Sequence, residues 1–417
     1  MADFTWNKGQ REAIDRIRGW ADKTAEGMEL SLTGPAGSGK TSLLKAIVPF
    51  LSGQKVAWTA MTGRAAVRLR DLTSEPVSTL HSVLYDRPRE DRKGKLWFNR
   101  VKPPDFKFLV VDEASMMGPK IYNDLREFIM QGVRILFVGD GYQLPPVLDY
   151  KEIKDHGEDF SVFREVPGCA LTQVMRSDDG IIRVATQLRC ENQVPKKCME
   201  GYSIRRSKTP GTEAVEEFLM DNDDHFVITW RNRLRMQANR LVRKRLGMDG
   251  LLPKPGEPVM MCRNGQSDGS PPEFVLNGEI HWGSGWDRGP SLGPEVQTQW
   301  FYTDHGIRVL VNTQGKDEPM DGFMPHVEDW KKYMSERRIS RTPEIVPITY
   351  GYIGTAHKAQ GDQYRKVTIF LSREDLANDK FRKDTYLPDG STMSFATRWL
   401  YTSLTRAQKE VTLILGS

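Results

Sequence analysis

The stretch "ELSLTGPAGSGKTSLLKAIVPFL", residues 29–51, decides the fold of this chain. It reads as a short apolar strand, a glycine-rich turn and a helix. The turn, "GPAGSGKT" at 34–41, fits the pattern G-x-x-x-x-G-K-[ST] in the strand-to-helix context that this pattern needs. Backbone N–H groups of such a turn surround phosphates, and Lys40 would reach the β and γ oxygens. The stretch therefore predicts a nucleoside triphosphate site on an α/β fold.

The whole turn and the start of its helix are expected to bind the nucleotide. These residues are Gly34, Pro35, Ala36, Gly37, Ser38, Gly39, Lys40, Thr41 and Ser42. Thr41 would also hold Mg²⁺.

A second motif supplies two carboxylates. "LVVDEAS", residues 109–115, is an apolar strand that ends in Asp112 and Glu113. In enzymes with this type of turn, the Asp at such a strand end binds Mg²⁺ and a neighbouring Glu can polarise the attacking water. We therefore expect Asp112 to share the metal with Thr41 and Glu113 to act on water.

The regions after the turn alternate strands with helices. Apolar runs at 55–62, 106–115 and 133–140 read as strands, and the continuous runs "FLVV" and "ILFV" are typical of parallel strands covered on both faces. A second alternating region begins near residue 169 and resumes at about 346. The 417 residues also exceed what one core usually serves, so two or more domains are expected.

The amino-acid composition changes between Pro253 and Pro347. This part is rich in Gly, Pro and Trp, with short strand-like pieces, and it indicates a small β-rich insertion.

Bulk composition excludes several classes of protein. No apolar run approaches the roughly 18 residues of a membrane-spanning helix, so no membrane partner is expected. The N-terminus shows no secretory pattern, and the four cysteines lack the spacing of a zinc site or a disulfide framework. A reducing cytoplasm, the host's if the protein is viral, fits these features. The net charge of +5 is only a weak hint of a polyanionic partner.

The third strand narrows the choice of family. "LFVGDGYQLPPV", residues 136–147, closely resembles the sensor motif of superfamily 1 helicases. The resemblance implies that Gln143 senses the γ-phosphate, and a role in capping a turn is the alternative. Other motifs follow in the family's order. Gln10 is similar to the family's adenine-reading glutamine, and Arg176 and Arg406 resemble its two arginine fingers.

The resemblance also implies residues that contact a nucleic-acid strand. "TAMTGRAAVRL" and "STLHSVL" supply Thr62 and His81, and "GTAHKAQGDQ" supplies Thr355, His357 and Lys358. Contact with the strand's phosphates and a purely structural role are equally open for the two histidines. Trp230, beside a basic helix, is expected to lie in the core rather than to stack on bases.

Within the superfamily, this chain is most similar to the RecD-like and Dda-like branch. That branch translocates 5'-to-3' on single-stranded DNA and carries an SH3-like barrel in its second motor domain, which implies both for this chain. Two places depart from the branch's pattern: Asp362 and Gln363 follow the "HKAQG" motif, and Gly141 and Tyr142 precede Gln143. These departures leave the details of the DNA and sugar contacts open.

The stretch "RKGKLWFNRVKPP", residues 92–104, lies where the branch has a β-hairpin, or pin, that meets the duplex. By analogy of position, Phe98 would stack on the last base pair and Trp97 would pack against the motor domain. The two roles could be exchanged, and a purely structural hairpin is also open.

The resulting expectation is an α/β chain with two RecA-like motor domains. The first spans 1–84 and 106–170 with the hairpin at 85–105, and the second spans 171–252 and 346–417 with an SH3-like insertion at 253–345.

We expect an ATP-dependent DNA helicase that uses ATP and Mg²⁺, acts as a monomer on single-stranded DNA and on junctions with duplex, and works with replication or recombination proteins. An RNA helicase and a translocase that displaces proteins are the nearest alternatives. A non-catalytic nucleic-acid-binding loader is a further one, against which the intact set of catalytic motifs counts.

Overall fold

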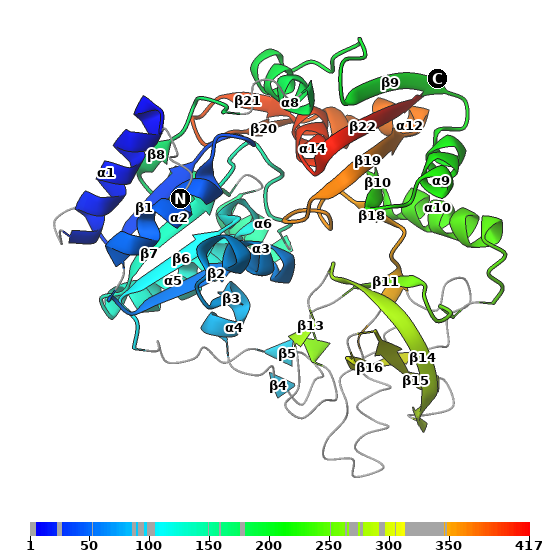
Figure 1. The fold of residues 1–417 in the computed structure, drawn as a ribbon, viewed down its shortest axis with the longest axis horizontal. Helices are drawn as coiled ribbons and strands as arrows, with labels where there is room; N and C mark the ends of the chain where they lie inside the picture. Colours follow the sequence, from blue (N-terminus) through cyan, green and yellow to red (C-terminus); the bar gives the residue numbers. More distant parts are fainter. Residues whose placement is uncertain are drawn as a thin grey trace.

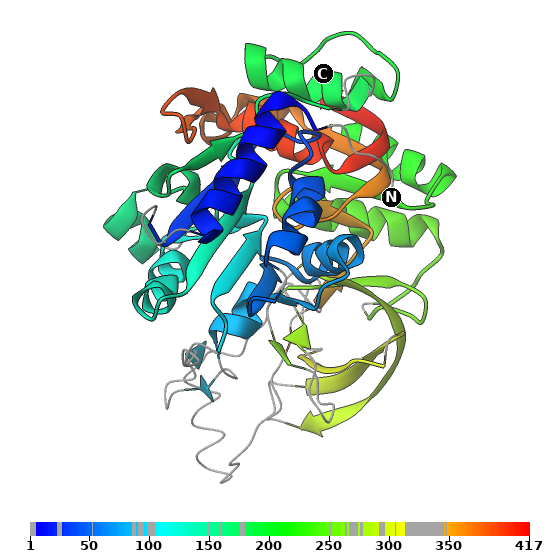
Figure 2. The same cartoon turned by 60° about the vertical axis from the view of Figure 1, so that its left-hand side comes forward.

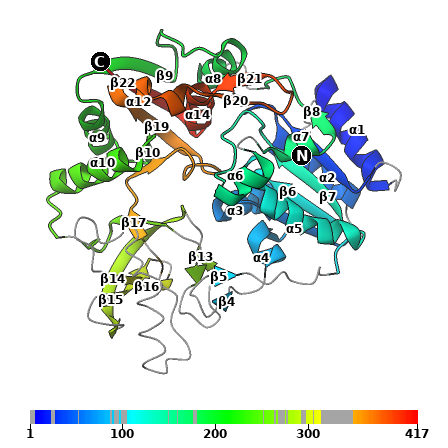
Figure 3. The ribbon, with the colours of Figure 1, turned by 180° about the vertical axis from the view of Figure 1, so that it is seen from behind.

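The structure, a computed structural model, describes residues 6–22, 27–51, 53–85, 89–90, 96–97, 105–148, 150–157, 160–175, 180–250, 252–262, 265–266, 274–275, 278–291, 297–304, 306–312, 346 and 348–417. Three sheets organise these residues (Figure 1). Two are parallel and covered by helices, and the third is antiparallel. Figure 3 shows the same three bodies from behind.

The first body contains the predicted nucleotide motifs. Its six-stranded parallel sheet has the order β3 (Val77–Thr79), β2 (Val56–Ala60), β6 (Phe108–Asp112), β7 (Arg134–Gly139), β1 (Glu29–Thr33) and β8 (Gly168–Ala170). Its helices are α1 (Lys8–Asp22), α2 (Lys40–Leu51), α3 (Gly63–Thr73), α4 (Leu80–Leu84), the 3-10 turn η2 (Ala114–Met116), α5 (Pro119–Met130), α6 (Tyr150–His156) and α7 (Val162–Glu165).

The apolar runs of β6 and β7 are buried along their whole length, as the sequence predicts. Because these strands are covered on both faces, the sheet has two cores. Ile17 of α1 and Leu43 of α2 belong to one core, and Leu125 and Phe128 of α5 belong to the other. Because β6, β7 and β1 are parallel neighbours, their carboxyl ends lie side by side at one edge of the sheet. Ligands bind at this edge in open α/β folds.

The second body is also a parallel sheet, with five strands. Its order is β18 (Ile353–Thr355), β10 (His225–Thr229), β19 (Tyr364–Leu371), β22 (Ala407–Gly416) and β9 (Tyr202–Ser207). The helices are α8 (Gly180–Glu191), α9 (Pro210–Met220), α10 (Asn232–Arg245), α12 (Arg373–Ala377), α13 (Asp379–Arg382) and α14 (Phe395–Leu404), and β20 (Asp384–Tyr386) pairs with β21 (Thr392–Ser394). Trp230 packs on Phe381 with ring centroids 4.6 Å apart and lies, partly buried, against the core of this body.

The third body is the β-rich insertion, as expected from its composition. Its antiparallel sheet has the order β16 (Arg308–Asn312), β15 (Gln297–Thr303), β14 (Ile280–Ser291), β11 (Pro258–Met261) and β17 (Ile348–Tyr350), and β12 (Gly265–Gln266) pairs with β13 (Phe274–Val275). Figure 2 shows its curved strands below α10. Val259, Phe301 and Val309 share one core with helices α9 and α10 of the second body.

The hairpin expected between 85 and 105 is present as a two-stranded antiparallel pair. In it β4 (Arg89–Glu90) pairs with β5 (Leu96–Trp97). The side chain of Trp97 and the whole of Phe98 lie outside the described residues, so their roles stay predictions. The domain boundaries proposed from the sequence also stay predictions.

Candidate functional site

The glycine-rich turn connects β1 to α2 at the carboxyl edge of the first sheet. Gly37 and Gly39 have φ angles of +77° and +86°, which side-chain-bearing residues rarely adopt. A Cβ on Gly39 would also come within 2.6 Å of Gln10 Nε2. Lys40 Nζ donates to the carbonyl oxygens of Gly34 at 2.6 Å and Pro35 at 3.0 Å. The turn thus has the predicted shape, with the lysine folded over it.

Gln10 is fixed against this turn. It is buried, and its Nε2 donates to the carbonyl oxygen of Ser38 at 3.0 Å. Asn7 holds it from the other side, because Gln10 N donates to Asn7 Oδ1 and Asn7 N donates to Gln10 Oε1. Gln10 therefore lies beside the nucleotide turn, and its reading of adenine stays a prediction.

The two predicted carboxylates end β6 and are buried. Asp112 Oδ1 accepts from Glu113 N at 2.9 Å, whereas Asp112 Oδ2 has no hydrogen-bond partner among the described residues. Glu113 has a left-handed backbone with φ of 54° and accepts from Arg68 Nη2 at 3.1 Å. Burial and the Glu113 charge raise the pKa of Asp112 to about 6. Burial also acts to raise the pKa of Glu113, but the guanidiniums of Arg68 and Arg406 outweigh it and lower that pKa.

Several buried polar atoms at this edge of the sheet have no hydrogen-bond partner within the part of the chain that the structure describes. They are Ser38 Oγ, Asp112 Oδ2, Ser115 Oγ and Gln143 Oε1. Buried polar groups are nearly always hydrogen-bonded, so a cluster of unsatisfied ones indicates a place for a polar ligand. A nucleotide and a hard cation would satisfy these oxygens, and the predicted Gln143 is among them.

Helix α14 of the second body closes the site from the opposite side. Tyr401 Oη accepts from Ala36 N, in the glycine-rich turn, at 2.8 Å and donates to Asp140 Oδ2 at 2.6 Å. Arg398 donates to the carbonyl oxygens of Gln143 at 2.7 Å and Gly141 at 3.0 Å. The two bodies thus meet directly at the predicted sensor motif.

Arg406, the second predicted finger, is buried in the same interface. Its guanidinium donates to the carbonyl oxygens of Thr402 at 3.1 Å and Asp362 at 3.3 Å and to Thr405 Oγ1 at 3.2 Å. Burial lowers the pKa of Arg406, and the charge of Glu113 acts in the opposite direction. The arginine therefore lies within electrostatic reach of the Glu113 carboxylate. The first predicted finger, Arg176, lies outside the described residues.

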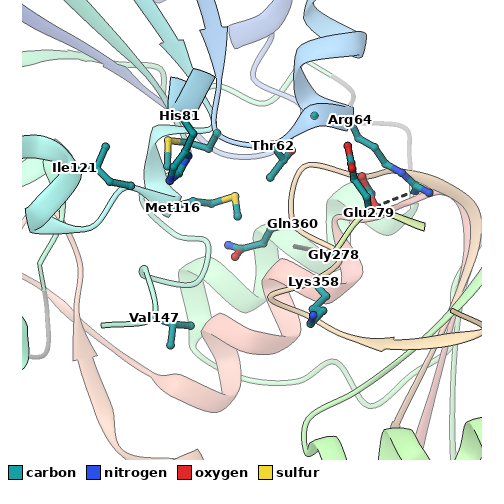
Figure 4. A pocket seen from close by; sticks show the side chains of 13 residues that line it. Thr62, Arg64, His81, Met116, Ile121, Val147, Gly278, Glu279, Lys358 and Gln360 are labelled. Carbon is teal, nitrogen blue, oxygen red and sulfur yellow. Dashed lines mark hydrogen bonds and ion pairs between the residues drawn. The ribbon is translucent and has the colours of Figure 1, made fainter. Parts of the chain in front are cut away.

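A cavity of about 340 Å³ lies between the two parallel bodies and the insertion (Figure 4). Three residues predicted to contact a strand, Thr62, His81 and Lys358, line it. The other lining residues are Met61, Gly63, Arg64, Met116, Ile121, Val147, Gly278, Glu279, Gln360 and Asp362. Predicted strand contacts from motifs almost 300 residues apart thus face one space.

Two further strand-contact predictions, Thr355 and His357, lie at the turn that carries Lys358 but are not among the residues that line the cavity. Thr355 is buried, and its carbonyl oxygen accepts from Lys358 N. Burial lowers the pKa of His357 to about 4, and burial with the charge of Lys120 lowers the pKa of His81. Both histidines are therefore neutral near pH 7, which suits hydrogen bonding better than charge pairing.

The sequence analysis missed four side chains that build this site: Arg64, Arg68, Arg398 and Tyr401. A signal existed for each pair. Arg64 and Arg68 are four residues apart in α3 and so share one face. Arg398 and Tyr401 have the i, i+3 spacing in the helix before the finger motif.

The described residues contain neither a membrane-spanning helix nor a cluster of metal ligands. No described helix is long and apolar enough to cross a membrane. No group of three or more His, Cys, Asp or Glu in this part of the chain could hold a metal ion.

Comparison with known proteins places these features in context. Residues 5–203 match the family model of an AAA domain. The ATP-dependent DNA helicase dda of Enterobacteria phage T4 is 30% identical over 233 residues, 52% of this chain and 52% of that protein. The ATP-dependent RecD2 DNA helicase of Deinococcus radiodurans is 39% identical over 118 residues, 28% of this chain and 16% of that protein. The chain thus spans about half or less of the length of these relatives.

Solved structures align with almost the full length of the chain. A structure of Pif1 helicases at forked double-stranded DNA aligns with a TM-score of 0.55 at 18% identity, covering 98% of this chain and 92% of that one. Bacteroides Pif1 bound to single-stranded DNA aligns with a TM-score of 0.53 at 19% identity, covering 99% and 92%. These alignments confirm the predicted fold class, including two RecA-like bodies and a β-rich insertion.

Proposed function

We propose that this chain, a member of superfamily 1 helicases in the branch of Dda, RecD and Pif1, is an ATP-dependent DNA helicase that moves 5'-to-3' on single-stranded DNA. One observation carries the proposal. The interface that closes the nucleotide site also contains the cavity lined by Thr62, His81 and Lys358. A change in nucleotide state that moves one body against the other therefore changes the strand site as well.

The nucleotide site supplies the groups that phosphoryl transfer needs. Lys40 would leave its contacts with Gly34 and Pro35 to bind the phosphates, and Gln143 Oε1 is without a partner and can orient water or phosphate. Glu113, held by Arg68, is charged and can polarise the attacking water. Arg176 and Arg406 would neutralise charge from the second body.

The residues present fit Mg²⁺. Asp112 Oδ2 is buried and has no hydrogen-bond partner among the described residues, and the charge of Lys40, which precedes Thr41 in α2, acts on this carboxylate. Carboxylate and hydroxyl oxygens are suitable ligands. When bound, the ion would neutralise charge on the β- and γ-phosphate oxygens. Asp112 and Thr41 would hold it, and Glu113 would remain free of it to act on water.

Duplex separation requires a part that meets the junction. The β4–β5 hairpin is our candidate, with Phe98 at the duplex and Trp97 packed on the motor or with these roles exchanged. Phe98→Ala should then impair unwinding and spare DNA-stimulated ATPase. Equal loss of both activities would leave the hairpin a structural role only.

Two measurements test the proposed function. ATPase is measured with single-stranded DNA, with single-stranded RNA and without polymer, which separates a DNA motor from an RNA helicase and from a non-catalytic loader. Unwinding is then measured on duplexes with a 5' or a 3' tail. Activity from the 5' tail is expected; activity only from the 3' tail would overturn the polarity, and translocation without unwinding would favour a protein-displacing translocase.

The chain's setting follows from the same proposal. We expect it to act as a monomer alongside replication or recombination proteins. Its four free cysteines, Cys169, Cys190, Cys198 and Cys262, suit a reducing compartment such as the cytoplasm.

A further inference from the structure

An ion pair joins the two motor bodies across the wall of the strand cavity. Arg64, at the start of α3, donates from Nη1 to Asp362 Oδ2 at 2.9 Å. Tyr364 fixes the carboxylate by donating its hydroxyl to the same oxygen at 2.9 Å. Asp362 is one of the two residues that depart from the pattern of the branch after the "HKAQG" motif. The acidic partner of this ion pair is therefore not part of that pattern.

The two partners differ in their access to a ligand. The side chain of Asp362 is 5% exposed, whereas that of Arg64 is 34% exposed, and both line the cavity. Figure 4 shows Arg64 beside Glu279 of the insertion, on the opposite side of the cavity from His81. An incoming polyanion therefore reaches the guanidinium of Arg64 first and would compete with Asp362 for it.

Asp362 depends on Arg64 for its charge. Burial raises the pKa of Asp362 to about 6, and the strongest opposing influence is the charge of Arg64. A buried carboxylate that loses its partner is costly, so removal of Arg64 favours a rearrangement of the segment that carries Asp362.

Each partner of the ion pair is connected to the nucleotide site through one further arginine. On α3, Arg68 lies one turn after Arg64 and donates to Glu113, the residue proposed to act on water. In the second body, the finger Arg406 donates to the carbonyl oxygen of Asp362. A movement of Arg64 would therefore shift Arg68 and its contact with Glu113, and a movement of Asp362 would shift Arg406.

We propose that Arg64 is a phosphate-binding residue of the strand site, and that Asp362 holds it in the strand-free state and releases it to the strand's phosphodiester. The inference rests on the proposed function. Arg64 exchanges a carboxylate for a phosphate, and the segments that carry Arg68 and Arg406 then readjust around Glu113. The pair would thus restrain hydrolysis until a strand is bound.

The test measures affinity of the full chain for oligo(dT) by fluorescence anisotropy over a range of salt concentrations. Each phosphate contact to a single strand contributes about 0.7 to the slope of log affinity against log salt concentration. Arg64→Ala should lower affinity and reduce that slope by about 0.7. Asp362→Asn should raise affinity severalfold and leave the slope unchanged, because Arg64 becomes available while the side chain keeps its shape.

The double variant decides between release and mere structural support. In the Arg64→Ala background, Asp362→Asn should no longer raise affinity. Asp362→Asn alone should also raise ATPase without DNA, so that the stimulation by DNA falls. Arg64→Lys keeps the charge and should retain most of the slope, which gives a second variant if Arg64→Ala unfolds.

Arg70→Ala is the matched control. Arg70 lies on the same helix, is exposed and is paired only loosely with Asp71 at 3.9 Å, so its removal should leave the slope unchanged. An unchanged slope in Arg64→Ala, or weaker binding in Asp362→Asn, would overturn the inference about Arg64 and leave the proposed function unaffected. Failure of the wild-type chain to bind oligo(dT) would instead overturn the proposed function and the inference with it.

Discussion

The hydroxyl of Tyr401 donates a 2.6 Å hydrogen bond to Asp140, across the interface between the two parallel-sheet bodies. The same oxygen accepts from Ala36 N in the glycine-rich turn. One phenol thus joins a helix of the second body to two loops of the nucleotide site in the first.

Tyr401→Phe should destabilise the protein and slow ATP hydrolysis. The change leaves the carboxylate of Asp140 and the N–H of Ala36 without this partner, and a lost buried hydrogen bond of this kind costs about 1–3 kcal/mol. Urea unfolding gives the free-energy change, and phosphate release gives the rate. Tyr386→Phe, at an exposed tyrosine, is the control and should change stability by less than about 0.5 kcal/mol. A Tyr401→Phe protein as stable as the wild type would show that the bridge contributes nothing.

Lys40→Ala should abolish ATPase and leave strand binding largely intact. Lys40 Nζ contacts only carbonyl oxygens of its own turn, Gly34 and Pro35, among the hydrogen bonds of the described residues, so its loss disturbs no core. Removal of a charge that stabilises a transition state typically costs roughly 10²–10³ in rate. Phosphate release and oligo(dT) anisotropy on the same preparation measure both effects. Substantial remaining hydrolysis would refute the assignment of the turn.

Asp112→Asn should stabilise the nucleotide-free protein above pH 6. The pKa of Asp112 is raised to about 6 from 3.8, so the folded state binds its proton more tightly than the unfolded state does. Wild-type stability therefore falls as pH rises from about 4 to 6 and stays lower above that. The Asn variant lacks this loss, and its advantage in melting temperature should be full at pH 8 and vanish near pH 4.

Magnesium supplies the contrasting measurement for the same variant. If Asp112 holds the ion, Mg²⁺ with nucleotide should raise the melting temperature of the wild type more than that of Asp112→Asn. Equal shifts would remove Asp112 from the metal site.

Gly361→Ala should weaken strand binding as well as stability. Gly361 has φ of +84°, and a Cβ there would lie 2.5 Å from Thr62 Oγ1 across the interface. Gly390→Ala is a close control, because Gly390 also has φ of +84° but nothing lies within 4 Å of its Cβ position. The two variants share a backbone cost of about 1 kcal/mol, and only Gly361→Ala should lower oligo(dT) affinity. Equal affinity in both would show that the close approach of Gly361 to Thr62 is unimportant for the strand.

Local patterns were sufficient for the framework of the site. The glycine-rich turn, the buried strand before Asp112 and the β-rich texture after Pro253 each depend on neighbouring residues, and the structure confirms all three. Trp230, expected in the core, packs against it and is partly buried.

Contacts between the bodies could not be predicted in the same way. Tyr401 and Asp140 are 261 residues apart, and Arg64 and Asp362 are 298 apart. No periodicity or turn pattern links such positions, because their contact depends on how two separately folded sheets dock. The departure at Asp362 was visible in the sequence, but its arginine partner was not.

The strands β17 and β18 have a mechanical consequence. β17 pairs with β11 in the insertion and β18 pairs with β10 in the second parallel sheet, and only Gly351 and Tyr352 separate them. Two residues span roughly 7 Å at full extension, so this connection has almost no slack. A force that a nucleic-acid strand exerts on the insertion would therefore be transmitted through this short backbone connection. The force would act on Thr355, at the end of β18, and on the turn that carries Lys358.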